Sequence, residues 1–462
     1  MRRLLCLLLV VLWPGMACAL PTMVAAALAR SGIPQDAVGI LVQPIGAAPL
    51  LAHNADTPFN PASVMKLVTT AAALDQLGPS HQFITRAAIE GELDGTTLRG
   101  TLYLQGGGDP ALSQPRLWAL LRELRNRGIQ RVSGDLVLDA SVYALPETDP
   151  AAFDGAPLRP YNAEPSGLML THNTVAVTLH PGPDALRVTL DPPVAPIQVE
   201  ATINTHDACS AWREDRSFES NVGGLRVIGS YPLACGTRTI WLNLLPPAQN
   251  SLAHIHLLLR ELGIVIEGQI RFGATPATAH EWLAWHSPPL AQLVADTNKW
   301  SNNLMAKALF LNLGLLNDAP PATWKKARQQ MQAWLSKREI QGVVIENGAG
   351  LSRADRISAA QLGHLLDEIA RQPYAPEFMA SLPVWGRDGT LKTRPADHPA
   401  AGRARLKTGS LNGSRALAGF VHATDRTWIV VMLINHPRAS QSTSAQEALL
   451  TWLLQAQTSG SD

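Results

Sequence analysis

The stretch Asn60-Pro61-Ala62-Ser63-Val64-Met65-Lys66, with the apolar run that follows it, decides how this chain is organised. Asn60 suits the N-cap of a helix. Pro61 suits the first helical position, because its missing N–H would have no partner there. Residues 67–74 are mostly apolar, which predicts a helix that is buried on most of its sides. Ser63 is therefore expected in the first turn of a core helix.

Lys66 follows Ser63 by three residues, so the two side chains share one face of this helix. A serine hydroxyl is a poor nucleophile, and a neighbouring amine with a lowered pKa can act as its base. The helix dipole also favours the alkoxide that develops at this end. The pattern predicts an activated serine. A capping serine beside a solvated lysine is the alternative as long as the pattern stands alone.

The N-terminus has the features of a secretory signal peptide over residues 1–19. Arg2 and Arg3 are followed by an apolar run over 4–13 and by the small residues Ala17-Cys18-Ala19. The run is too short to span a bilayer, although an uncleaved anchor is the alternative. No later segment offers about 18 uninterrupted apolar residues. We expect a soluble chain exported to the periplasm.

Length and charge set broad limits on the protein. With 462 residues the chain is too long for one hydrophobic core, so two or three domains are expected. The 38 basic and 37 acidic residues nearly cancel and no basic run stands out, which argues against nucleic acid as a partner. The 46% hydrophobic fraction is typical of a globular protein.

Cysteine and histidine usage predicts a disulfide and no metal site. Cys209 and Cys235 are the two cysteines beyond the signal peptide, and in an oxidising compartment they most simply form a disulfide that closes a 26-residue loop (235 − 209). The chain has no CxxC and no HExxH pattern, and His254 and His256 are interpreted as structural. Neither a metal nor a cofactor is expected.

Periodicity divides the chain into helical ends and a strand-rich middle. The first 80 residues predict a helix, a hairpin and the Ser63 helix. From about residue 83 short strand-like runs follow one another, with a helix at 115–127 among them. Helices return at 251–262 and 290–336, and a strand hairpin with a final helix ends the chain. The expected strands are 38–43, 49–52, 83–89, 98–104, 132–138, 175–179, 186–190, 197–203, 225–231, 239–244, 416–422 and 428–435.

Two further motifs follow the serine motif in a fixed order. Ser301-Asn302-Asn303 opens the expected helix 304–313. Lys407-Thr408-Gly409-Ser410 ends a strand-like run just before the terminal hairpin. Together with Ser63-x-x-Lys66 they form the S-x-x-K, S-D-N and K-T-G set of penicillin-binding proteins and class A β-lactamases, with Asn302 in place of the aspartate. Three motifs in this order make coincidence a poor explanation.

The spacing between the motifs indicates which type of penicillin-binding protein the chain resembles. Ser301 follows Ser63 by 238 residues (301 − 63), too many for a direct connection within one compact domain. The chain therefore resembles the D-alanyl-D-alanine carboxypeptidase/endopeptidase family of the penicillin-binding protein 4 type (low-molecular-mass class C), in which a second domain interrupts the catalytic one. Further matching segments are Gly107-Gly108-Asp109-Pro110, Asn347-Gly348-Ala349-Gly350-Leu351-Ser352-Arg353 and Gly389-Thr390-Leu391.

The resemblance implies an α+β fold. A serine DD-peptidase domain of the β-lactamase-like type, an antiparallel sheet flanked by helices, is expected from residues 20–82 and 284–462. Residues 83–283 would form the inserted strand-rich region, as two nested domains.

The resemblance also implies catalytic roles. Ser63 would attack the carbonyl of the D-Ala–D-Ala bond and form an acyl-enzyme, and Lys66 would take its proton if burial and nearby cations lower the pKa of the amine. Ser301 would pass the proton to the leaving amine. Asn303 would orient Lys66 and the substrate amide.

The remaining roles concern substrate binding. Lys407 and Thr408 would hold the substrate's C-terminal carboxylate, and the N–H groups of Ser63 and Ser410 would form the oxyanion hole. Gly409 would let the strand approach the ligand closely. Asp154 would face the diaminopimelate side chain, although a surface-loop aspartate is an equally good interpretation.

The sequence thus predicts a periplasmic serine DD-peptidase that acts on peptidoglycan stem peptides and is inhibited by β-lactams. A β-lactamase is the first alternative. It needs a base for deacylation, and Glu346 lacks the expected sequence context. A catalytically inactive peptidoglycan-binding protein is the second alternative. Carboxypeptidase or endopeptidase preference, a homodimer and loose membrane association stay open.

Overall fold

The structure is a computed structural model that describes residues 19–458 except 195, 206–207, 210–215 and 222–223. The expected signal peptide lies outside the described residues but for its last position. Among the described helices none is both long enough and apolar enough to cross a bilayer.

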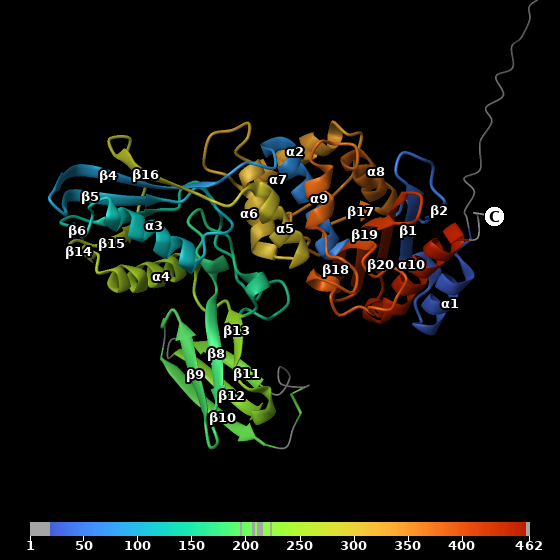
Figure 1. Cartoon of the computed structure of the whole chain (residues 1–462), viewed down its shortest axis with the longest axis horizontal. Coiled ribbons are helices and arrows are strands. Elements are labelled where there is room, and N and C mark those ends of the chain that lie inside the picture. The colour runs from blue at the N-terminus through green and yellow to red at the C-terminus, as the bar shows by residue number, and fades with distance from the viewer. Residues whose placement is uncertain (1–18, 195, 206–207, 210–215, 222–223, 459–462) are drawn as a thin grey trace, which may run out of the picture.

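Three bodies make up the chain (Figure 1). The one at the right of the view is built on an antiparallel five-stranded sheet of order β18-β19-β20-β1-β2, which joins strands from both ends of the sequence. The expected terminal hairpin is confirmed as the β19–β20 pair. The bounds are β18 (Ala404–Leu411), β19 (Ser414–His422), β20 (Thr427–Asn435), β1 (Val38–Pro44) and β2 (Leu51–His53).

Helices cover both faces of this sheet. Alternate residues of β20 divide between two cores, with Val430 and Met432 facing α1 and α10, and Val431 and Leu433 facing the other helices. Strands covered on both faces read as continuous apolar runs, which is why this hairpin stands out in the sequence. The first face carries α1 (Thr22–Arg30) and α10 (Thr443–Thr458); the second carries α2 (Lys66–Leu77), α5 (Leu290–Lys299), α6 (Asn303–Leu313), α7 (Trp324–Ser336), α8 (Ala359–Ile369) and α9 (Ala375–Ser381).

The predicted α+β class is confirmed by these layers and by the strand-rich middle of the chain. The second body is a seven-stranded sheet that packs against two helices in one core, at the left of Figure 1. Its elements are β4 (Ile84–Asp94), β5 (Thr97–Gln105), α3 (Gln114–Asn126), β6 (Arg131–Val132), β7 (Leu136–Asp139), α4 (Pro247–Leu262), β14 (Val265–Ile266), β15 (Ile270–Phe272) and β16 (His280–His286).

The third body consists of two three-stranded sheets that share a separate core, at the bottom of Figure 1. One sheet has the order β13-β8-β9 and the other β10-β12-β11. The bounds are β8 (Val175–Pro181), β9 (Leu186–Asp191), β10 (Ile197–Asn204), β11 (Arg216–Asn221), β12 (Gly224–Pro232) and β13 (Arg238–Leu242).

Several elements differ from the sequence-based expectation. The strand expected at 132–138 is split into β6 and β7, with Gly134 between them. Gly134 packs closely against β5, since a Cβ there would lie 2.5 Å from the Gly100 carbonyl oxygen. Strands β11 and β16, and the short pair β3 (Pro58–Phe59) and β17 (Ile357–Ser358), had no clear alternation in the sequence and were not predicted. The division into 20–82 with 284–462 and 83–283 stays our proposal.

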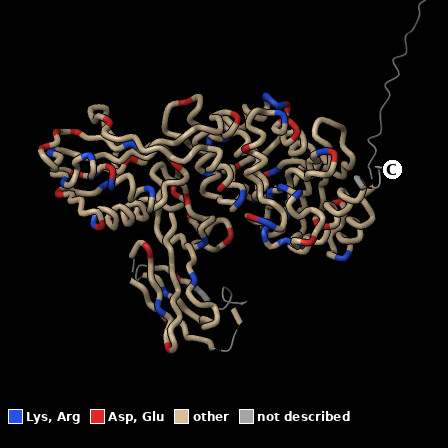
Figure 2. Tube along the Cα trace, viewed as in Figure 1, with Lys and Arg blue, Asp and Glu red and all other residues tan. Residues whose placement is uncertain are grey.

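Charged residues of both signs are interspersed along all three bodies (Figure 2). No body presents an extended face of a single sign in that view, as the near-zero net charge leads one to expect.

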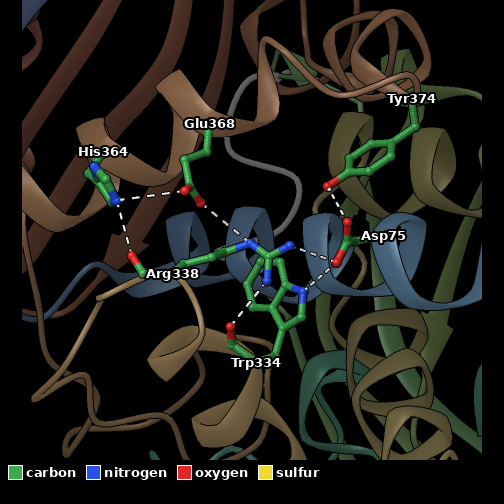
Figure 3. A network of polar contacts seen from close by, with 6 residues as sticks. All are labelled: Asp75, Trp334, Arg338, His364, Glu368 and Tyr374. Carbon is green, nitrogen blue, oxygen red and sulfur yellow. Dashed lines mark hydrogen bonds and ion pairs between the residues drawn. The ribbon is translucent and has the colours of Figure 1, made fainter.

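A polar network holds the C-terminal half of α2 against its neighbours (Figure 3). One carboxylate oxygen of Asp75 accepts from the Trp334 indole at 2.8 Å and from the Arg338 guanidinium at 2.7 Å, and the other accepts from Tyr374 at 3.2 Å. The Arg338 guanidinium also pairs with Glu368 of α8 at 3.4 Å and lies over the Trp334 ring. Because α2 begins at Lys66, the network fixes the helix that carries this lysine.

The predicted disulfide between Cys209 and Cys235 is confirmed, and it links segments of the third body. Cys235 lies in the core shared by the two small sheets. A cross-link of this length restricts the unfolded chain and so stabilises the folded body.

Replacing both cysteines (Cys209→Ser with Cys235→Ser) should lower the free energy of unfolding of the third body by about 3.5 kcal/mol, the loop-entropy value for a closed loop of this size. Differential scanning calorimetry should show an earlier transition for that body, and the transition of the body with the five-stranded sheet should stay in place. A single earlier transition of the whole chain would contradict the assignment.

Candidate active site

Ser63 lies in a 3₁₀ turn, Ala62–Met65, that leads directly into α2 at Lys66. The expectation that Ser63 lies in the first turn of the α-helix, with Asn60 as its N-cap, is therefore wrong in detail. The Asn60 side chain accepts from the Ala62 N–H at 2.9 Å, but the N-cap position of the 3₁₀ turn belongs to Pro61, one residue later. Ala62 has a φ of 47°, a conformation that non-glycine residues rarely adopt outside functional sites.

Three segments meet at the Lys66 ammonium nitrogen. Nζ donates to Ser63 Oγ at 2.9 Å, to Asn303 Oδ1 at 2.5 Å and to the Ala349 carbonyl at 2.5 Å. The side chain is fully buried. These contacts place the amine against the serine hydroxyl and leave it little freedom to turn away.

The electrostatic environment favours the neutral amine of Lys66. Burial is the main cause that lowers the pKa of Lys66 well below its usual value, and the positive charges of Lys407 and Lys307 lower it further. Asp355 acts in the opposite direction when it is ionised, and burial raises the pKa of Asp355 itself to about 7. A lysine with a depressed pKa beside a hydroxyl can accept that hydroxyl's proton near neutral pH.

The second motif forms the turn between α5 and α6. Ser301 has a φ of 55°, and Asn302 caps α6 by accepting from the Met305 N–H at 3.0 Å. This geometry directs the Ser301 hydroxyl toward Lys407 and the Asn303 amide oxygen toward Lys66. A left-handed serine costs roughly 1–3 kcal/mol, and such strained residues cluster at active sites.

The third motif lies on β18. Lys407 Nζ donates to Ser301 Oγ at 2.8 Å and to the Thr408 carbonyl at 2.7 Å, and burial lowers the pKa of Lys407 to about 7. The Thr408 hydroxyl lies 2.8 Å from that of Thr390. The structure thus brings together Ser63, Lys66, Ser301, Asn303 and the Lys407 strand.

Gly409 allows the strand to pack against the serine turn. A Cβ at this position would lie 2.4 Å from the Pro61 carbonyl oxygen. The expectation was that Gly409 lets the strand approach the ligand, and the close approach that the structure records is to the serine-bearing turn. Gly350, with a φ of +74°, has a similar role because its Cβ would meet the Ala62 carbonyl oxygen.

Asp154 lies in the inserted region, where its carboxylate accepts hydrogen bonds. Partial burial acts to raise its pKa, but hydrogen bonds from Tyr161 and Asn162, at 2.7 and 2.8 Å, outweigh this and keep the pKa of Asp154 below its usual value. The neighbouring Phe153 ring lies under the Arg353 guanidinium, 5.0 Å away. Arg353 in turn donates to the Asn412 carbonyl at 2.7 Å, just beyond β18.

Two cavities open at the site. One, of about 590 Å³, is lined by Ser63, Ser301, Thr408 and Ser410 together with Thr390, Arg394 and Arg415. The other, of about 640 Å³, shares Ser301 and is lined by the exposed rings of Trp241 and Trp300 and by Tyr161. The first can hold the reacting bond, and the second extends the site toward the inserted region.

Sequence reasoning did not assign several groups to the site. The Ala349 carbonyl, Thr390, Asp355 and Arg415 take their places through tertiary contacts. The segments that carry Ala349 and Thr390 matched the family, but nothing in the residues gave them a role. No signal in the sequence pointed to Asp355 or Arg415. In the described ranges no group of three or more His, Cys, Asp or Glu side chains is placed to hold a metal ion.

Two substitutions should move the pH dependence of serine acylation in opposite directions. Lys407→Met removes a positive charge that lowers the pKa of Lys66. The acidic limb of the acylation rate against pH should therefore move to higher pH. Asp355→Asn removes a negative charge that raises this pKa, so the limb should move to lower pH. Each displacement should be about 0.5–1 pH unit.

The measurement is the rate of penicillin acylation from pH 5 to 10. The quantity compared between variants is the pH at the midpoint of the acidic limb of this rate profile, and not the maximal rate. Lys337→Met, an exposed lysine at the end of α7, is the matched control and should leave the limb in place. Displacement of both site variants in the same direction would contradict Lys66 as the titrating base.

Comparisons with known proteins agree with this geometry. The model of the D-Ala-D-Ala carboxypeptidase 3 (S13) family matches residues 20–456. A D-alanyl-D-alanine carboxypeptidase of Actinomadura sp. (strain R39) is 30% identical over 389 residues, which cover 78% of this chain and 70% of the relative.

The fold matches that of penicillin binding protein 4 (dacB) from Haemophilus influenzae. The TM-score is 0.78 at 24% identity, over 93% of this chain and 99% of that one. A second structure of the Haemophilus protein, complexed with a novel β-lactam, matches with a TM-score of 0.73 at 24% identity, over 90% and 96% of the two chains.

Proposed function

The chain belongs to the S13 family and is a serine-type D-Ala-D-Ala carboxypeptidase of the penicillin-binding protein 4 type, and on this premise we propose that it works through an acyl-enzyme on Ser63. Its site of action is the periplasm, and its substrates are the D-Ala–D-Ala ends of peptidoglycan stem peptides, the D-Ala–diaminopimelate cross-links, or both. β-Lactams acylate the same serine.

One observation carries this proposal: Lys66 Nζ lies 2.9 Å from Ser63 Oγ in a fully buried position. In the first step Ser63 Oγ attacks the carbonyl carbon of the substrate while its proton passes to the neutral Lys66 amine. The N–H groups of Ser63 and Ser410 stabilise the oxyanion, a contribution of about 3–4 kcal/mol per donor in other enzymes.

Collapse of the tetrahedral intermediate breaks the bond to the leaving nitrogen. Ser301 donates its proton to that nitrogen and is reprotonated from Lys66, so that D-alanine leaves as the amine and the enzyme keeps an ester on Ser63. Water then attacks the ester, with Lys66 as the base, and restores the serine. The hydrogen bond that Lys407 donates to Ser301 Oγ, at 2.8 Å, holds the hydroxyl to which we give this role.

The position of Glu346 argues against the β-lactamase alternative. Its carboxylate lies 3.8 Å from Arg328 of α7, is partly exposed, and does not line the cavity that contains Ser63. A class A enzyme needs a glutamate near the acyl-serine to activate the deacylating water. Glu447 does line that cavity, but its carboxylate pairs with Arg394 at 3.3 Å. The acyl-enzyme formed with penicillin should therefore be long-lived.

Intact-protein mass after mixing with penicillin tests the proposal. We expect one added penicillin per chain, stable over minutes, and no adduct on Ser63→Ala. Ser410→Ala is a useful companion, because it changes a hydroxyl in the same cavity and keeps the nucleophile. An adduct that persists in Ser63→Ala, or rapid loss of penicillin without any adduct, would overturn the acyl-enzyme assignment.

Asp154 supports recognition of the diaminopimelate side chain. Hydrogen bonds from Tyr161 and Asn162 keep its carboxylate charged, and a charged carboxylate attracts the ammonium group of that side chain. The contact between Phe153 and Arg353 keeps this segment beside the loop that precedes β17.

Asp154→Asn should lower kcat/KM about 10-fold for a stem peptide with diaminopimelate in the third position, through the loss of one charge-assisted contact. Peptides with norleucine at that position should be cleaved at an unchanged rate. Asp149→Asn, a change in the same loop, is the control and should alter neither value. Equal losses for both peptides would mean that Asp154 only maintains the loop.

A further inference from the structure

Two tryptophan rings beside the candidate active site are open to solvent. Trp300 directly precedes Ser301 in the chain and is 61% exposed, and Trp241 of β13 is 48% exposed. Both rings line the 640 Å³ cavity that Ser301 also lines. A large apolar surface that stays exposed beside a concave site marks a place where a ligand binds. The three motifs give these rings no role.

The cavity with the two tryptophans continues into a further one. This further cavity has a volume of about 730 Å³ and shares Arg159, Pro160 and Trp241 with the first. Its lining includes Phe218 of β11 and the β13 strand around Trp241. The two cavities together, here called the trough, therefore lead from Ser301 to the strands of the third body.

Hydrogen bonds fix one wall of the trough in the free chain. Asn243, the residue after β13, donates its backbone N–H to the Leu158 carbonyl at 2.9 Å and its side-chain amide to the Pro157 carbonyl at 3.0 Å. The Leu158 side chain packs against the core of the third body. The loop at Pro157 is thus tied to the strand that carries Trp241. A site that is formed before binding loses little conformational freedom when a ligand enters.

The charges in the further cavity indicate a neutral ligand. Among its described lining residues, Arg159 and Glu219 are the charged ones and have opposite signs, and Glu219 already pairs with Arg226 at 2.9 Å. The hydroxyls of Ser220 and Thr239 also line this cavity. Aromatic rings with a few hydroxyl groups fit the flat C–H face and the hydroxyls of a pyranose ring. They offer little to the carboxylates of a stem peptide.

The proposed substrate carries such rings at a suitable distance. A stem peptide is attached through its N-terminus to an acetamido sugar of the glycan strand, and four residues separate that sugar from the scissile bond. Four extended residues span about 13–14 Å. The sugar therefore lies outside the cavity that contains Ser63 and within the space that adjoins it.

We propose that the trough binds the glycan strand of peptidoglycan, with the Trp241 ring stacked on the face of one pyranose. The inference rests on the proposed function of the Ser63 site. It adds a preference that the three motifs do not supply: stem peptides still attached to glycan bind more tightly than free stem peptides. The site only binds, so no bond is made or broken in the trough.

Binding is tested with the β-1,4-linked tetramer of N-acetylglucosamine, a neutral probe that carries no peptide. Calorimetry on Ser63→Ala chains should detect its binding. Adding Trp241→Ala should raise the Kd about 10-fold through the loss of one stacked ring, and Trp241→Phe should restore part of the affinity. Leu233→Ala is the matched control, since it removes another exposed apolar side chain of the third body that lines neither cavity. It should leave the Kd unchanged.

Turnover is compared on chains with Ser63 intact. The substrates are a free stem peptide that ends in D-Ala–D-Ala and the same peptide attached to a tetrasaccharide of the glycan strand. We expect a KM about 10-fold lower for the attached peptide. Trp241→Ala should remove this advantage and bring the two KM values together, whereas Leu233→Ala should keep it.

The outcomes separate the two proposals. Absence of probe binding, or an unchanged Kd in Trp241→Ala, overturns the inference. Equal losses for the free and the attached peptide in Trp241→Ala would mean that the trough holds the peptide, and would overturn it as well. If the probe binds through Trp241 while the chain with Ser63 intact cleaves neither substrate, the acyl-enzyme proposal fails and the glycan site stands.

Discussion

The structure depends on the burial of the Lys66 amine at the point where three separate segments meet. Its hydrogen bonds to Ser63, Asn303 and the Ala349 carbonyl join the start of α2, the start of α6 and the loop that precedes β17. A buried lysine is tolerated when hydrogen bonds satisfy it and its pKa falls. The contacts that assemble the site are therefore also those that make its lysine a base.

The packing around this point explains why so much of the fold is fixed. The loop that precedes β17 packs against the Ser63 turn at Gly350, and β18 packs against it at Gly409. Neither position has room for a Cβ. The Asp75 network holds the far half of α2, so the helix cannot shift to relieve the strain at Ala62. Strained residues persist only where the surroundings determine their conformation, and here a sheet covered on both faces supplies those surroundings.

The inserted bodies extend the site and leave its chemistry to the first body. Phe153 and Tyr161 reach the edge of the catalytic region, and Trp241 from the third body lines the cavity that shares Ser301. In the proposed mechanism the reaction uses the three motifs, whereas the choice of substrate needs contacts beyond the scissile bond. A division of this kind lets the recognition surface vary while the catalytic contacts stay fixed.

The sequence by itself determined the motifs, the disulfide pair, the buried hairpin and the interruption of the catalytic domain, because each depends on local residue patterns or on spacing along the chain. It did not determine the 3₁₀ turn at Ser63, the weakly alternating strands β11 and β16, or the partners of Lys66. Asp355 and Arg415 were beyond its reach as well. A lone aspartate and a lone arginine carry no local signal, and only tertiary packing decides which charge they meet and whether it is buried. The sequence was enough to propose the site residues, while the lowered pKa values of Lys66 and Lys407 are properties of the folded chain.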